Sequence, residues 1–129
     1  MIAFVGFVVY EFSPRQMCGS HGHHEFPSPG GRYKAVLYEY DCGATSDFGT
    51  HIAIIRDKEK FDPFDADDSG LFFTADSNHQ AIGVDEHGIL PVEVHWIDNS
   101  SLEVDIPEKA RVFRRENKIG PISVTYKNK

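Results

Sequence analysis

Two short segments near the C-terminus constrain the fold most, because their hydrophobic residues recur at every second position. In "VEVHWID", Val92, Val94 and Trp96 alternate with Glu93 and His95. The segment "LEVDI" repeats this alternation after the turn residues "NSS". A period of two places apolar side chains on one face of an extended strand. Two such runs joined by turn residues predict a β-hairpin.

Other short segments have the same β-like character. The strand candidates are residues 32–42, 50–57, 70–76, 92–98, 102–106, 110–115 and 121–127. No segment keeps a helical period over ten residues, and Pro63 interrupts the nearest approach to one. The sequence therefore predicts a mainly β fold: a single antiparallel meander sheet or a small β-sandwich of about seven strands.

The chain divides into three parts. Its 129 residues are enough for one domain of ordinary size. Residues 1–12 are almost wholly apolar and are compatible with a buried first strand, a shortened membrane anchor or an export segment. Residues 13–31 are rich in Gly, Pro, Ser and His and are expected to form a loop. Residues 32–129 are expected to form the β-domain.

The charge of the chain bears on its partners. The formal net charge is −7, which argues against nucleic acid as a partner, since phosphate binding requires a basic face. The segment from Pro107 to the C-terminus contains seven Lys and Arg residues but only two Glu residues. Because the whole chain has a net charge of −7, the part before Pro107 is strongly acidic. This asymmetry is compatible with a basic edge strand on an acidic body. It is also compatible with an acidic patch that docks a basic protein.

The most specific local pattern is "DADDSGLFFTAD". Asp65, Asp67, Ser69 and Asp76 stand at positions one, three, five and twelve, and Gly70 stands at position six. This is the spacing of oxygen ligands in a calcium loop. Aspartate and glycine are equally typical of ordinary surface turns, so an acidic loop is the alternative.

A histidine cluster offers a second candidate metal site. His21, His23 and His24 follow Cys18 in "CGSHGHHE". Neutral imidazoles and a thiolate suit zinc or copper, although a closed zinc site needs ligands from elsewhere in the fold. The alternative is an exposed histidine loop.

A catalytic site has little support in the sequence. The one catalytic triad that can be combined uses Cys42 as nucleophile, His51 as base and Asp47 as acid. A reactive thiol needs a helix N-terminus or a cationic neighbour, and neither is evident here. The chain is therefore expected not to be an enzyme and to need no cofactor.

The segment "DCGATSDFGT" separates two strand candidates and is expected to connect them. Its glycines permit positive φ, and its Thr, Ser and Asp side chains can bond their own backbone. We expect this connection to present a recognition surface. The residues concerned are Asp41, Gly43, Thr45, Asp47, Phe48 and Thr50.

Residues 28–36 and 41–45 carry a resemblance to a known family. The chain resembles small uncharacterised bacterial envelope proteins that share S-P-x-G-[KR]-Y-K-A-V followed by D-C-G-A-T. The two cysteines, Cys18 and Cys42, could by themselves be two thiols or one bridge. The resemblance implies that they form a disulfide in an oxidising compartment, and that residues 1–12 are a shortened anchor.

Three hypotheses follow for function. The first is a non-catalytic, extracytoplasmic β-domain, tethered or secreted, that binds a protein or small ligand. The second is an immunity or inhibitor protein that neutralises a basic toxin through its acidic face. The third is a module that binds Ca²⁺ or Zn²⁺ through the loops described above. Membrane contact is expected only through the N-terminal segment.

Overall fold

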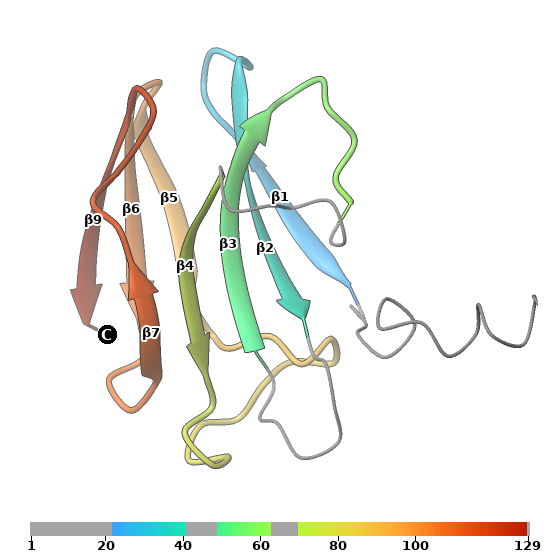
Figure 1. Ribbon diagram of the computed structural model, residues 1–129, viewed down its shortest axis with the longest axis vertical. Helices are drawn as coiled ribbons and strands as arrows, with labels where there is room; N and C mark the ends of the chain where they lie inside the picture. Colours follow the sequence, from blue (N-terminus) through green and yellow to red (C-terminus); the bar gives the residue numbers. More distant parts are fainter. Residues whose placement is uncertain (1–21, 41–48, 63–69, 129) are drawn as a thin grey trace, which may run out of the picture.

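The computed structural model describes residues 22–40, 49–62 and 70–128, which form two β-sheets packed face to face (Figure 1). These residues contain nine strands and no helix. The five-stranded sheet has the order β1(His23–Pro27), β2(Tyr33–Tyr40), β3(Gly49–Arg56), β4(Leu71–Asp76) and β7(Arg111–Arg115). The four-stranded sheet has the order β5(Glu93–Asp98), β6(Ser101–Ile106), β9(Ile122–Asn128) and β8(Lys118–Ile119). The predicted mainly β fold is thus confirmed, as a small β-sandwich.

The alternating segments form the hairpin that the sequence predicts. β5 and β6 pair antiparallel, with Val94 opposite Val104 and Trp96 opposite Leu102. Val94, Leu102 and Val104 are buried, whereas Glu93 is exposed on the other face. One face of this hairpin therefore contributes to the core and the other meets water.

The strand order differs from the predicted antiparallel meander. β7 leaves the second sheet and pairs with β4, and β9 returns to lie beside β6 in a parallel pair. A parallel neighbour and an antiparallel one require the same alternation of side chains. The sequence pattern therefore identified these strands but could not identify their partners.

The prediction that residues 13–31 form a loop was wrong for His23–Pro27, whereas residues 28–31 do form a turn. His23–Pro27 forms β1, the edge strand of the first sheet, which pairs antiparallel with β2. Four of its five side chains are exposed, so the segment carries no apolar period. Its backbone hydrogen bonds to β2 form the strand, and an edge position tolerates Pro27.

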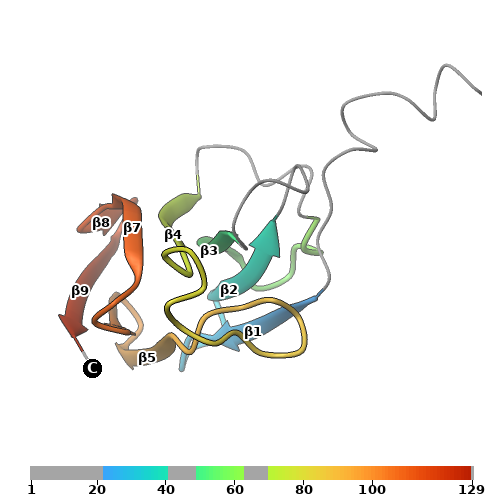
Figure 2. The ribbon, with the colours of Figure 1, turned by 90° about the horizontal axis from the view of Figure 1, so that it is seen from below.

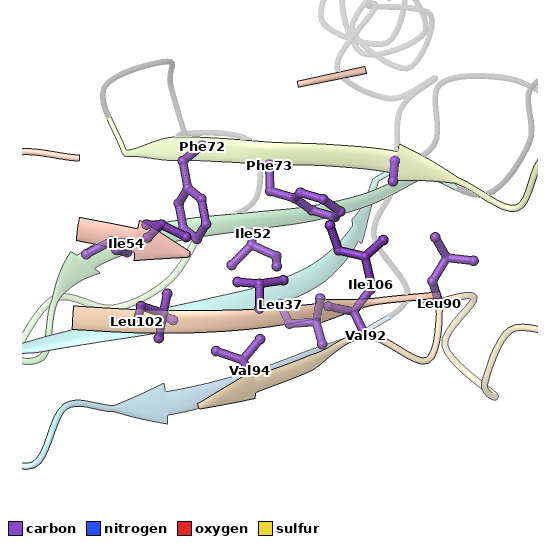
Figure 3. Packing of buried hydrophobic residues seen from close by; sticks show 14 of the residues in the cluster. Leu37, Ile52, Ile54, Phe72, Phe73, Leu90, Val92, Val94, Leu102 and Ile106 are labelled. Carbon is purple, nitrogen blue, oxygen red and sulfur yellow. The ribbon is translucent and has the colours of Figure 1, made fainter. Parts of the chain in front are cut away.

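The main core lies between the two sheets. Figure 3 shows Leu37, Ile52 and Phe73 of the first sheet facing the side chains of the second. The three first-sheet residues face Val94 and Leu102 of the β5–β6 hairpin, and the side chains in this layer are purely apolar. Burial of this apolar surface is the main force that holds the sheets together.

The first sheet is also partly covered on its outer face. Val36, Tyr38 and Ala53 form a second buried cluster there, and Tyr40 and Phe61 pack against it. Because both faces of β2 are covered, six of its eight residues are buried. This explains why the centre of β2, residues 35–38, is a continuous apolar run, whereas β5 and β6 alternate.

Hydrogen bonds join the two sheets at the edge where β1 and β5 meet, which Figure 2 shows from below. The indole Nε1–H of Trp96 donates to the carbonyl oxygen of Phe26 at 2.7 Å. At the end of the sandwich, the N–H of Gly30 donates to Oδ1 of Asn99 at 2.5 Å. These two bonds fix how the β1–β2 hairpin sits against the β5–β6 hairpin.

Replacing a core phenylalanine should measure the contribution of the intersheet layer. Phe73→Ala removes a fully buried side chain and should lower the free energy of unfolding by about 3–5 kcal/mol, through lost burial and the cavity left behind. Phe113, whose side chain is 64% exposed, gives the matched control: Phe113→Ala should change it by less than about 0.5 kcal/mol. Urea unfolding measures both, and similar losses in the two variants would contradict the assignment of the core.

Candidate functional site

A groove crosses the end of the sandwich at which the β1–β2 and β5–β6 turns lie, uppermost in Figure 1. Its first half is a hollow of about 560 Å³ lined by residues 30–33 and 56–58. Its second half, of about 400 Å³, shares Gly30, Arg32 and Tyr33 with the first and continues along the turns of the second sheet. We call these two hollows together the turn-end groove.

Antiparallel pairing gathers the charged side chains of this groove. β2 begins where β3 ends, so that Tyr33 is the register partner of Arg56. The N–H of Asp57 donates to the carbonyl oxygen of Arg32 at 2.9 Å, which extends the pairing by one step. Arg32, Arg56 and Lys58 are therefore neighbours in space, although 24 to 26 positions separate the first from the others.

The tight turn before β2 also shapes the groove. The N–H of Gly31 donates to the carbonyl oxygen of Ser28 at 2.9 Å, and Gly31 has a φ of +72°, a conformation that glycine adopts without strain. Gly30 approaches Asn99 so closely that an added Cβ would lie 2.8 Å from Oδ1 of Asn99. Glycine at position 30 thus permits the contact between the two turns.

The charge of the first hollow is opposite to that of the whole protein. Arg32, Arg56 and Lys58 are exposed and have no ion-pair partner among the residues that the structure describes. Asp57 is the one acidic residue in this lining. By contrast, Lys34 is held by Glu25 at 3.0 Å. Three cations around one hollow, none paired within the described ranges, form a local positive site on a chain of net charge −7.

The second hollow has a different chemistry. Tyr33, Pro121 and Ile122 give it an apolar wall, and Asn99 and Ser100 add an amide and a hydroxyl. The N–H and the hydroxyl of Ser100 both donate to Oδ1 of Asp98, at 2.9 and 3.3 Å, and these bonds hold the turn in place. The groove as a whole therefore offers a cationic half and a half suited to an apolar group.

The proposed recognition loop lies almost wholly outside the described residues. Outside them are Asp41, Cys42, Gly43, Thr45, Asp47 and Phe48, together with Cys18 and residues 1–12. Tyr40 pairs with Gly49, so the segment between them connects paired antiparallel strands, as predicted. Thr50 is fully buried, and its Oγ1 accepts a hydrogen bond from the N–H of Leu90 at 3.0 Å. Its side chain therefore braces the core and does not form part of a surface.

Of the four predicted ligands of the calcium loop, the structure describes only the last, Asp76. Asp65, Asp67 and Ser69 lie outside the described residues. The carboxylate of Asp76 accepts from Nη2 of Arg111 at 2.6 Å and from the N–H of Asn78 at 2.9 Å. Burial alone would raise the pKa of Asp76, but these hydrogen bonds hold it below its ordinary value. Asp76 thus already has a structural role in a partly buried ion pair.

The histidine cluster is divided between the two faces of β1. The ring of His23 packs against Phe61 at 4.8 Å, and its Nε2 lies 3.0 Å from Oε2 of Glu25. His24 lies on the other face, with its Nε2 3.5 Å from Oδ2 of Asp85. The structure therefore does not bring His23 and His24 together as ligands of one ion, and His21 lies outside the described residues.

His51 is enclosed by aromatic rings. Its imidazole lies 5.2 Å from the ring of Tyr38 and 5.7 Å from that of Tyr40. Burial lowers the pKa of His51 to about 4, so this side chain is neutral at pH 7. Cys42 and Asp47, which the sequence combined with it, lie outside the described residues.

Sequence reasoning missed the turn-end groove, although a signal for it exists. Arg32 is the first residue of one strand candidate, Arg56 stands near the end of the next, and Lys58 follows directly after it. In an antiparallel pair these positions meet.

Protein-family models, curated proteins and solved structures were compared with this chain, and none matches it. Within the residues that the structure describes, there is no helix long and apolar enough to cross a bilayer.

The stability of the protein should fall in mild acid because of His51. The pKa of His51 is about 4 in the folded state and about 6.5 in an unfolded chain. Between these values the unfolded state binds a proton that the folded state does not. The contribution of neutral His51 to the free energy of unfolding is therefore fully present above about pH 6.5 and is lost as the pH falls toward 4.

His51→Gln should flatten this dependence of the unfolding free energy on pH, as measured by urea unfolding at several pH values. An unaltered slope in His51→Gln would show that His51 does not titrate as its burial requires.

Proposed function

We propose that this chain is a non-catalytic binding domain that holds an anionic ligand in the turn-end groove. The observation that carries the proposal is the convergence of Arg32, Arg56 and Lys58, without ion-pair partners in the described part of the chain, on a hollow of about 560 Å³. Small-molecule sites in proteins typically have volumes of about 300–1,000 Å³.

The groove favours a ligand with an acidic group and an apolar part. Arginine presents a planar fork of N–H donors that matches a carboxylate or a phosphate, and lysine adds a compact charge. Beyond Arg32 and Tyr33, the wall formed with Pro121 and Ile122 can cover an apolar or aromatic group. A carboxylate attached to an aromatic or aliphatic group meets both demands.

We also propose that the domain acts outside the cytoplasm, tethered or secreted, with Cys18 and Cys42 joined in a disulfide. The support is the resemblance of residues 28–36 and 41–45 to envelope proteins and the presence of two cysteines in one chain. On this proposal the ligand is taken up from the envelope or the surroundings. Nucleic acid is not proposed as the ligand, because three cations on a chain of net charge −7 are too few to follow a phosphate backbone.

A second candidate function, an immunity or inhibitor protein for a basic toxin, has one observation in its favour. Glu93, Glu103 and Asp105 lie on the outer face of the β5–β6 hairpin, away from the core. A sheet face with several carboxylates is a surface to which a basic protein can bind. It lies on the second sheet and is separate from the turn-end groove.

Binding of 1-naphthoate, with neutral 1-naphthamide as the reference compound, tests the proposed groove. The carboxylate should bind at least about tenfold more tightly than the amide, because hydrogen bonds to charged groups contribute about 1.5–3 kcal/mol. Isothermal titration calorimetry gives both affinities. Arg32→Gln combined with Arg56→Gln should remove the preference for the carboxylate.

Lys58→Gln and Lys109→Gln separate a local site from the overall charge. Both variants lower the net charge by one, but Lys109 lies in the β6–β7 connection and does not line the groove. Lys58→Gln should weaken 1-naphthoate binding several-fold, and Lys109→Gln should not. Equal effects of the two substitutions, or equal affinities for the acid and the amide, would refute the groove as an anion site.

A further inference from the structure

A group of metal-ligating side chains lies on the outer face of the second sheet, away from the turn-end groove. Glu93 and His95 stand two residues apart on β5 and therefore point to the same side of the sheet. Asp105 of β6 is the register partner of Glu93. Hydrogen-bonded antiparallel strands thus hold all three residues next to one another, without contribution from a loop.

The three side chains converge to the separation that a bound ion requires. Nε2 of His95 lies 3.7 Å from Oε1 of Glu93 and 4.0 Å from Oδ2 of Asp105. One ligand atom from each residue lies within 4.8 Å of the other two. Bonds of about 2.0–2.2 Å to a tetrahedral zinc ion place its ligands about 3.4 Å apart, so small rotamer changes would close the site.

The surroundings of Asp105 give a second reason to expect a cation. Its Oδ1 is buried and has no hydrogen-bond partner in the described part of the chain. Lys127 is the register partner of Asp105 on β9, yet its Nζ lies 3.3 Å from Oε2 of Glu103. A buried carboxylate oxygen without a partner is unfavourable, and a metal ion that binds both oxygens of the Asp105 carboxylate would remove that cost.

We propose that Glu93, His95 and Asp105 bind a divalent transition-metal ion of the Zn²⁺ class. An imidazole with two carboxylates suits Zn²⁺, whereas Ca²⁺ and Mg²⁺ prefer oxygen ligands alone. His95 and Glu93 are each half exposed, so water or a partner's side chain can complete the coordination. A metal bound here would also cancel part of the negative charge on this face.

Titration of the tag-free protein with Zn²⁺ alone, followed by calorimetry, tests the site. One ion should bind per chain, and His95→Gln or Asp105→Asn should raise Kd by about tenfold or more. His87→Gln is the matched control. His87 lies near His24 and Asp85 in a separate cluster, and its removal should leave Kd unchanged. Ca²⁺ in place of Zn²⁺ should bind far more weakly.

Substoichiometric Co²⁺ locates the ion directly, since this paramagnetic ion broadens nearby amide signals in a ¹H–¹⁵N spectrum. Signals of residues 93–96 and 103–106 should be lost first, and His95→Gln should restore them. Loss centred instead on residues 22–25 and 84–88, Zn²⁺ binding that His95→Gln does not weaken, or Ca²⁺ binding as tight as that of Zn²⁺ would overturn the proposal.

Discussion

The burial of two apolar sheet faces against each other is the constraint on which the rest of this structure depends. Leu37, Ile52 and Phe73 on one side meet Val94 and Leu102 on the other. A shift of one residue in the register of any of these strands would turn its apolar side chains toward water. The same register brings the start of β2 to the end of β3, and Glu93 opposite Asp105. Both candidate sites are thus consequences of how the core is packed.

The distribution of charge in the folded protein is not the distribution along the chain. The sequence is basic after Ile106 and acidic before it. In the structure, however, two of the C-terminal cations lie beside carboxylates of other strands: Arg111 pairs with Asp76 at 2.6 Å and Lys127 with Glu103 at 3.3 Å. The positive groove is built instead from residues 32, 56 and 58 of the acidic part. Folding therefore creates two surfaces of opposite sign, one on each sheet.

Local motifs in the sequence were less informative about sites, because one residue type serves several purposes. Asp76 matches the last position of a calcium loop, but it lies at the end of β4 and accepts hydrogen bonds from Arg111 and Asn78. Thr50 matches a recognition loop, but it is buried and braces Leu90. His23 and His24 are neighbours in sequence and lie on opposite faces of a strand. Spacing along the chain describes a site only when the backbone conformation is already known.

By itself, the sequence determined that this is a β protein, where most of its strands lie and that β5 and β6 form a hairpin, because alternation with a period of two is a local property. It could not reveal the edge strand β1, whose formation rests on backbone hydrogen bonds and not on apolar side chains. Only the tertiary structure decided that β7 joins β4, that β9 runs parallel to β6, and which charged residues share a surface. The physical reason is that strand pairing and the meeting of distant side chains depend on the packing of the whole chain.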